Sequence, residues 1–101
     1  MKEQDIQKQI KDCLSVFGWY VVKNNTVGIY RQDTGHYIPS TCKGLADLTA
    51  IKNSRVVMIE VKQKGNKQSP DQKQFEKDWI AHGGEYWLVF SLEDLLIKLR
   101  Q

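Results

Sequence analysis

Residues 44–62 read GLADLTAIKNSRVVMIEVK, and this stretch decides the fold. It contains two apolar runs, 45–51 and 56–61, separated by the polar residues Lys-Asn-Ser-Arg. Two runs of strand length around a short polar turn predict a β-hairpin. A turn centred between Asn53 and Ser54 fixes the register and places these residues opposite each other: Ala46 and Val61, Asp47 and Glu60, Leu48 and Ile59, Thr49 and Met58, Ala50 and Val57, and Ile51 and Val56.

The two faces of this hairpin differ in chemistry, because successive side chains of a strand point to opposite faces. One face is wholly apolar, and we expect it to pack against helices. Its residues are Ala46, Leu48, Ala50, Val57, Ile59 and Val61. The other face ends in the charged residues Asp47, Glu60 and Lys62.

The segment before the hairpin is predicted to begin with an amphipathic helix over residues 3–17. Its apolar residues recur at helical spacing and a glycine follows them: Ile6, Ile10, Cys13, Leu14 and Phe17, then Gly18. Residues 19–23 are rich in strand-forming types and predict a first strand. Residues 24–43 are predicted to be mostly loop, with room for a short strand at 29–31.

The segment after the hairpin is predicted to form a helix, a strand and a second helix. Ser69 and Pro70 provide an N-cap and a first-turn proline, and Gly83-Gly84 ends that helix. We expect three residues to hold it to the core: Phe75, Trp79 and Ile80. Residues 85–90 predict a strand, and Ser91 caps a leucine-rich last helix. The order αβββαβα predicts one α/β domain over 1–101, with a mixed sheet flanked by helices.

Composition and charge exclude several classes of protein. With 101 residues, 41% of them hydrophobic, the chain is too short for a multi-domain enzyme and too apolar to be disordered. No apolar run reaches membrane-spanning length, and the N-terminus lacks a signal peptide's apolar core, so we expect a cytoplasmic protein. Cys13 and Cys42 fit no metal-binding spacing and are expected to remain thiols, with Cys13 serving as a small core residue.

Positive charge is concentrated in the middle of the chain. Residues 43–77 contain eight basic and four acidic residues, whereas residues 78–101 contain two basic and four acidic ones. Such a bias is compatible with nucleic-acid binding, but a solvated lysine-rich surface is its commoner explanation.

Asp47 and Glu60 form the constellation that carries chemistry. The predicted register places their Cβ atoms about 5 Å apart on one face. Two ionised carboxylates repel at that distance unless they share a proton or a divalent cation, and Mg²⁺ prefers such oxygen ligands. Lys62 lies on the same face, where an ammonium can orient water and offset charge on phosphorus. The same sequence pattern would also be found at an ordinary sheet edge, where the three charged side chains simply extend into solvent.

Two further polar residues are candidates for the same site. Glu3 lies on the same helical face as the apolar residues that follow it, so its carboxylate is expected to point inward. An acidic residue is also favourable in the first turn of any helix, which is a purely structural explanation. Gln72 completes a Ser-x-x-Gln capping box, which is a sufficient structural role, yet its side chain could also reach the site. Both readings of each residue remain open at this point.

Three motifs in order resemble those of the virus-type replication-repair nucleases (VRR-NUC), a branch of the PD-(D/E)xK nuclease superfamily. They are Gly44-Leu-Ala-Asp47, Glu60-Val-Lys62 and Gln68-Ser-Pro-Asp-Gln72. The resemblance also includes Glu3 with Ile6-Gln7, Lys23-Asn24-Asn25 and Gly83-Gly84. One departure is Ala46, where the family often has proline. The resemblance implies a restriction-endonuclease-like αβββαβ core of the stand-alone type.

The resemblance also implies roles for individual residues. Asp47, Glu60 and the Val61 carbonyl would bind Mg²⁺ or Mn²⁺, and Lys62 would position the attacking water. Glu3 would join the site through water or metal, and Gln72 would orient the Lys62 end or the substrate. Phosphate contacts would come from Lys43, Lys64, Lys67 and Lys73, with Lys23, Asn25 and Arg31 as secondary candidates.

The activity that the resemblance implies is metal-dependent hydrolysis of DNA phosphodiester bonds by a structure-specific endonuclease. Stand-alone members look like small homodimers similar to Holliday-junction resolvases, with a place in DNA repair or recombination. The alternatives are a flap or single-strand nuclease of the same family and a nucleic-acid-binding module without catalysis. An enzyme acting through His36 or His82 has little support, and a nucleotide cofactor is not expected, because neither a Gly-x-Gly-x-x-Gly nor a Walker loop is present.

Overall fold

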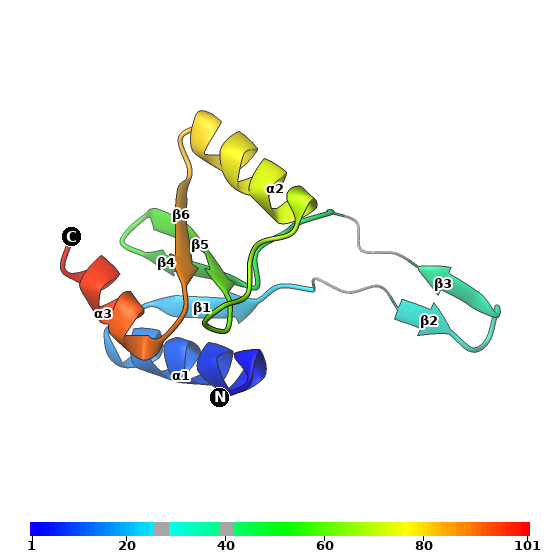
Figure 1. Cartoon of the computed structure of the whole chain (residues 1–101), viewed down its shortest axis with the longest axis horizontal. Helices are drawn as coiled ribbons and strands as arrows, with labels where there is room; N and C mark the ends of the chain where they lie inside the picture. The colour runs from blue at the N-terminus through cyan, green and yellow to red at the C-terminus, as the bar shows by residue number, and fades with distance from the viewer. Residues whose placement is uncertain (26–28, 39–41) are drawn as a thin grey trace.

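The computed structural model of the chain describes residues 1–25, 29–38 and 42–101 (Figure 1). Residues 26–28 and 39–41, which belong to the stretch expected to be mostly loop, lie outside the described ranges. In the described part no helix is long and apolar enough to cross a membrane. The elements in chain order are α1 (Glu3–Val16), β1 (Tyr20–Lys23), β2 (Ile29–Arg31), β3 (His36–Ile38), β4 (Leu48–Lys52), β5 (Arg55–Val61), α2 (Pro70–Ala81), β6 (Glu85–Val89) and α3 (Leu92–Leu99).

The main sheet is four-stranded, in the order β1-β4-β5-β6. Strand β4 pairs antiparallel with β1 on one side and with β5 on the other, whereas β6 pairs parallel to β5 after the α2 crossover. The β4–β5 register has Leu48 opposite Ile59 and Ile51 opposite Val56, as the sequence predicts. Asn53 and Ser54 both have positive φ (49° and 67°), which is typical of the tight two-residue hairpin turn. The predicted α/β class with a mixed sheet is therefore confirmed.

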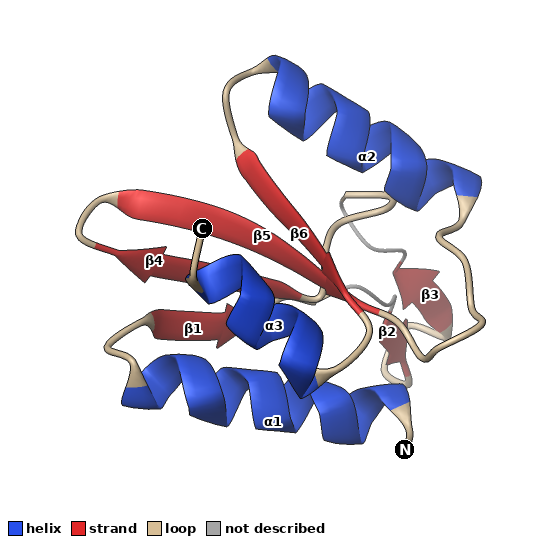
Figure 2. Ribbon diagram, turned by 60° about the vertical axis from the view of Figure 1, so that its left-hand side comes forward, coloured by secondary structure: helices blue, strands red, loops and turns tan. Residues whose placement is uncertain are grey.

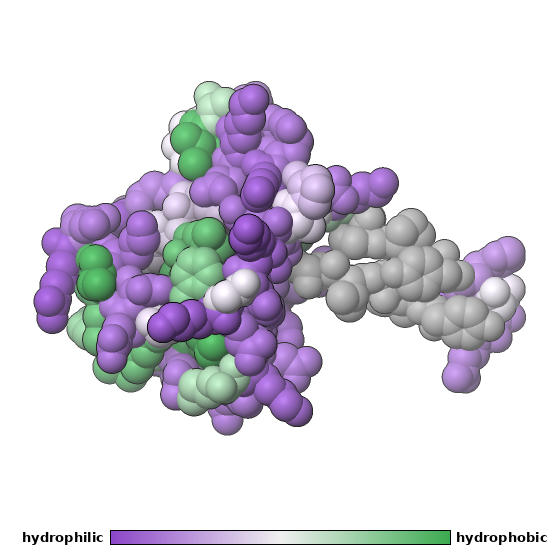
Figure 3. All heavy atoms as spheres, in the orientation of Figure 1, coloured by the Kyte–Doolittle hydropathy of each residue, from purple (hydrophilic) through white to green (hydrophobic). Residues whose placement is uncertain are grey.

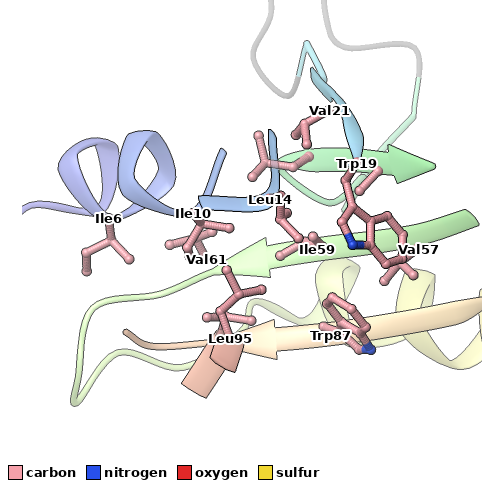
Figure 4. Close-up of a cluster of buried hydrophobic side chains, with 13 residues drawn as sticks. Ile6, Ile10, Leu14, Trp19, Val21, Val57, Ile59, Val61, Trp87 and Leu95 are labelled. Atoms are coloured by element: carbon pink, nitrogen blue, oxygen red, sulfur yellow. The ribbon is translucent and has the colours of Figure 1, made fainter. Parts of the chain in front are cut away.

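The core lies between one face of this sheet and the two helices α1 and α3 (Figures 2 and 4). Every residue of the predicted apolar hairpin face is buried, and Ile10 and Leu14 of α1 and Leu95 of α3 pack against that face. The prediction for Phe17 is wrong: α1 ends at Val16, and Phe17 is a half-exposed C-cap. Cys13 is partly buried against the core, and neither Cys13 nor Cys42 is in a disulfide.

Helix α2 lies on the opposite face of the sheet and covers only the β6 side (Figure 2). The predicted capping box is present at its start. Phe75 stacks on Trp79 at 5.8 Å between ring centroids, and the Trp79 indole N–H donates to the Glu85 carbonyl at 2.8 Å. A side chain at Gly84 would overlap the Trp79 indole, which explains the glycine. The prediction for Ile80 is wrong, because it is more than half exposed where α2 extends past the sheet.

Strands β2 and β3 form a separate two-stranded ribbon, in which Tyr30 is opposite Tyr37 and Arg31 is opposite His36. Figure 1 shows this ribbon projecting from the main body, beyond the end of β1. The short strand expected at 29–31 is confirmed, whereas β3 was expected to be loop. Most of the surface in Figure 3 is hydrophilic, and the apolar side chains visible there lie over the main body.

Candidate active site

The hairpin brings Asp47 and Glu60 together, as the register predicts. Glu60 is in β5 and its side chain is 1% exposed, while Asp47 directly precedes β4. The backbone N–H of Val61 donates to Asp47 Oδ2 at 2.9 Å, which turns the Asp47 carboxylate toward the end of β5. The alternative that these charges simply emerge into solvent is therefore wrong for Glu60.

Asn24, the residue after β1, holds the Asp47 backbone in place. Its N–H donates to the Asp47 carbonyl at 2.8 Å, and its side-chain amide donates to the Ala46 carbonyl at 3.0 Å. The amide oxygen in turn accepts from the Thr49 hydroxyl at 2.9 Å. One asparagine thus ties the end of β1 to both sides of Asp47. Nothing in the local sequence pattern assigns it that role.

Glu60 is a buried carboxylate with incomplete hydrogen bonding. Its Oε2 accepts from the Gln72 amide at 3.2 Å, and the ammonium of Lys62 lies 4.0 Å away. Its Oε1 is buried and has no hydrogen-bond partner among the described residues. Burial, and then the neighbouring carboxyl of Asp47, raise the pKa of Glu60 to about 9. The site therefore favours a proton or a cation between these two carboxyl groups.

Gln72 fills both of the roles that the sequence left open. Its backbone N–H and its side-chain Oε1 complete the capping box with Ser69, while its side-chain Nε2 donates to Glu60. The start of α2 comes very close to the backbone of Gly44, which has φ +77°. Any side chain at position 44 would overlap the Asp71 backbone. The loop before Asp47 can therefore pack directly against the helix that presents Gln72.

Lys62 and Glu3 both lie close enough to Glu60 to affect its pKa. The Lys62 side chain is 13% exposed, follows Glu60 on the same face, and lowers the pKa of Glu60. Glu3, in the first turn of α1, acts in the opposite direction and contributes to the raised pKa of Glu60. Glu3 Oε2 accepts from the Asn66 side chain at 3.1 Å. Asn66 belongs to the loop after β5, and the sequence offers no signal for this contact.

The candidate DNA contacts divide into two groups by position. Four exposed lysines lie in segments that border the carboxylates: Lys43, Lys64, Lys67 and Lys73. Lys23 ends β1 next to Asn24, and Asn25 follows. Arg31 lies apart on the projecting ribbon, where its guanidinium makes two hydrogen bonds to Asp33, at 2.9 and 3.2 Å.

The two histidines have surroundings unlike those of a catalytic pair. His36 is exposed on the ribbon, and His82 is the exposed C-cap of α2, with its Nδ1 2.7 Å from the Asp78 carbonyl. This contact gives His82 a structural role at a helix end.

The carboxylate pair fits a divalent cation. In the described ranges no three His, Cys, Asp or Glu side chains are grouped as a ligand set. Mg²⁺, however, commonly takes only one or two carboxylates and completes its coordination with water, backbone and phosphate oxygens. The unpartnered Glu60 Oε1 next to Asp47 provides such oxygen ligands. The Val61 N–H points to Asp47, and the N–H and C=O of one strand residue point to the same side, so we expect the Val61 carbonyl on the Asp47 side as well.

A solved structure described as a VRR_NUC domain has the same architecture. It superimposes with a TM-score of 0.76 over 98% of this chain and 95% of that chain, at 20% sequence identity. No protein-family profile matches the chain. No curated protein matches it either. The likeness therefore rests on three-dimensional arrangement, and it confirms the resemblance drawn from the motifs at the level of the fold: the chain has the fold of a VRR_NUC domain.

Proposed function

We propose that the chain, residues 1–101 as one domain, is a metal-dependent endonuclease that hydrolyses phosphodiester bonds of DNA. The observation that carries this proposal is the buried Glu60 carboxylate, which lies beside Asp47 with one oxygen lacking a donor. A protein gains nothing in stability from burying a carboxyl group that must take up a proton beside a second carboxyl group. Their arrangement is useful when a divalent cation, Mg²⁺ or Mn²⁺, binds between them.

Each residue of the cluster has a separate task. Asp47, Glu60 and the Val61 carbonyl hold the cation, which when bound supplies Lewis-acid stabilisation of charge on phosphorus. Lys62 orients the attacking water and offsets charge on the phosphate. Gln72 keeps the Glu60 carboxylate in one orientation. Glu3 joins the site from the first turn of α1, where its carboxylate accepts a hydrogen bond from Asn66.

The reaction is an in-line displacement at phosphorus. Water attacks on one side and loses a proton, while the bond from phosphorus to the leaving sugar oxygen breaks on the other side. The leaving oxygen takes up a proton from solvent, which gives one phosphate end and one hydroxyl end. The exposed lysines that border the cluster contact the flanking phosphates, since lysine ammonium groups bind phosphates without regard to base sequence.

We further propose a structure-specific activity on branched DNA, such as a four-way junction, carried out by a homodimer. A single chain of this size offers little surface with which to contact two DNA branches, whereas a two-fold dimer presents two sites. The sheet face that carries the cluster also has an uncovered apolar row, in which Tyr20, 70% exposed, is in register with Ile51 and Val56. A second copy could cover this row. Sedimentation that detects only monomer with junction DNA would refute the dimer.

The test of the activity is cleavage of end-labelled four-way junction, flap, linear duplex and single-stranded DNA, with Mg²⁺, Mn²⁺ or EDTA. The control is Glu60→Ala, which excludes a contaminating nuclease. Metal-dependent cutting of the junction supports the full proposal, and cutting of flaps or single strands keeps the site but changes its substrate. No cutting, with DNA binding retained, would favour a binding module. The carboxylates argue against that module, because they repel phosphates.

A further inference from the structure

A small cleft of about 200 Å³ lies between α1 and the end of β1. Figure 2 shows these two elements running side by side, and they are in contact. The lining residues are Gln4, Gln7, Lys8, Lys11, Lys23 and Leu48. The four residues from α1 share one face of the helix, because they are spaced three and four apart. Buried Leu48, opposite Lys23 in the register, closes the cleft below.

The charged side chains that line this cleft are all positive. Three of its lining residues are lysines, and none is acidic. In residues 1–25, 29–38 and 42–101 the ion pairs are Arg31–Asp33, Arg55–Glu85 and Lys62–Glu60, and none of them involves these three lysines. Three like charges around one small cleft create a local potential that attracts an anion.

Gln7 gives a second, independent indication of a ligand. It lines the cleft, and its Oε1 is buried without a hydrogen-bond partner among the described residues. A buried amide oxygen without a donor is unfavourable in the free protein. A lysine ammonium drawn into the cleft by an anion can donate to this oxygen, while the Gln7 Nε2 donates to the anion.

We infer that this cleft binds a phosphate group of the DNA backbone close to the bond that is cut. The inference rests on the proposed function and assigns Gln7, Lys8 and Lys11 a role there. Gln7 is one helical turn from Glu3, about 6 Å along the axis. The bound phosphate therefore belongs to a nucleotide that flanks the scissile bond. Leu48 is the one apolar lining residue, which leaves no anchor for an apolar peptide side chain.

The first test compares two double variants that remove the same charge. Lys8→Gln with Lys11→Gln alters the cleft, and Lys77→Gln with Lys98→Gln alters helices away from it. DNA affinity is measured in EDTA, where no cutting occurs, at several salt concentrations. Each lost phosphate contact lowers the slope of log affinity against log salt by about 0.7–0.9. We expect that decrease in the cleft variant and not in the control.

The second test locates the phosphate. Single phosphates on either side of the scissile bond are replaced in turn by neutral methylphosphonates. Wild-type affinity should fall at one position close to the scissile bond, and the cleft variant should show no additional loss at that position. Gln7→Leu should weaken DNA binding while leaving the melting temperature unchanged or higher.

The outcomes separate this inference from the proposed function. Equal salt slopes for the two double variants, or a methylphosphonate scan without a position-specific loss, would overturn the phosphate site while metal-dependent cleavage stands. A Gln7→Leu variant that melts earlier but binds DNA normally would also overturn it, because the role of Gln7 would then be structural. A wild-type protein that neither binds nor cuts DNA would overturn both.

Discussion

The two ends of the β4–β5 hairpin treat charge in opposite ways. Beside the turn, Arg55 donates two hydrogen bonds to Glu85, at 2.6 and 2.8 Å, and both side chains are more than 40% exposed. At the other end, Glu60 is 1% exposed, lies beside another carboxyl group and has its nearest cation, Lys62, 4.0 Å away. At the turn end, the two opposite charges are paired and exposed to solvent. At the other end, an acidic side chain is buried and its nearest cation is too far away for a hydrogen bond.

This difference separates what the chain needs to fold from what it needs to act. The Arg55–Glu85 pair lowers the pKa of Glu85 and is further supported by two tryptophan rings, Trp19 and Trp87, each with its centroid 5.7 Å from the guanidinium. Because both side chains remain exposed, forming this ion pair removes little water from either of them. The buried Glu60 works against folding whenever it is ionised, so the surrounding core must compensate. Such a conflict is typical of a functional site.

The largest effect is expected from Glu60→Gln. The substitution keeps the size of the side chain but removes the negative charge, so cleavage should fall by at least about 10³-fold. The same change should leave the melting temperature of the metal-free protein at pH 8 equal or higher, because folding no longer has to protonate a carboxylate that is ionised in the unfolded chain. Activity and thermal unfolding of one preparation test both parts. A variant that cuts like wild type would remove Glu60 from the site.

Lys62→Ala should lower cleavage by about 10²-fold or more, because the group that orients the attacking water is lost. Metal binding should remain, since lysine is not a ligand. The control is Lys77→Ala, an exposed lysine of α2 that should leave cleavage unchanged. Single-turnover rates at saturating Mn²⁺ measure the effect, and equal rates for the two variants would contradict the role of Lys62.

The two ends should also differ in how pH affects stability. A raised pKa means that the folded state holds the Glu60 proton more tightly than the unfolded state, so this stabilisation is present at low pH and is lost as pH rises from about 4.5 to about 9. Mg²⁺ should stabilise the protein increasingly over the same range, because it needs ionised carboxylates. Melting curves with Mg²⁺ and with EDTA test this, and Glu60→Gln should abolish the dependence.

The smallest effect is expected at the turn end. Arg55→Ala removes an exposed ion pair and contacts to two tryptophan rings, which together contribute about 1–2 kcal/mol to the free energy of unfolding. Cleavage per folded molecule should not change. Urea denaturation and cleavage rates of this variant measure the two quantities. A large loss of cleavage without a loss of stability would mean that the turn end takes part in function.

Much of the site could be predicted from the sequence because it depends on alternation along one hairpin. A polar turn at Asn53 fixes the register, and the register alone brings Asp47 opposite Glu60. Contacts between distant segments have no such rule, so the Asn66–Glu3 hydrogen bond and the Asn24 anchor were not predicted.

The errors have equally local causes. Helical spacing gives the apolar side of a helix but not how far the sheet extends beneath it, which is why Ile80 is exposed. Strand β3 has only three residues and no clear apolar alternation, so its pairing with β2 could not be read from its composition.

The most direct test of the central claim is the rate of DNA cleavage as a function of Mn²⁺ concentration, for wild type and for Glu60→Gln that binds the same DNA equally well. If Asp47 and Glu60 form the cation site, the wild-type rate rises to saturation and the variant remains inactive at every Mn²⁺ concentration that saturates wild type. Superimposable curves would show that the metal acts elsewhere, and the buried carboxylate pair would then not be the active site.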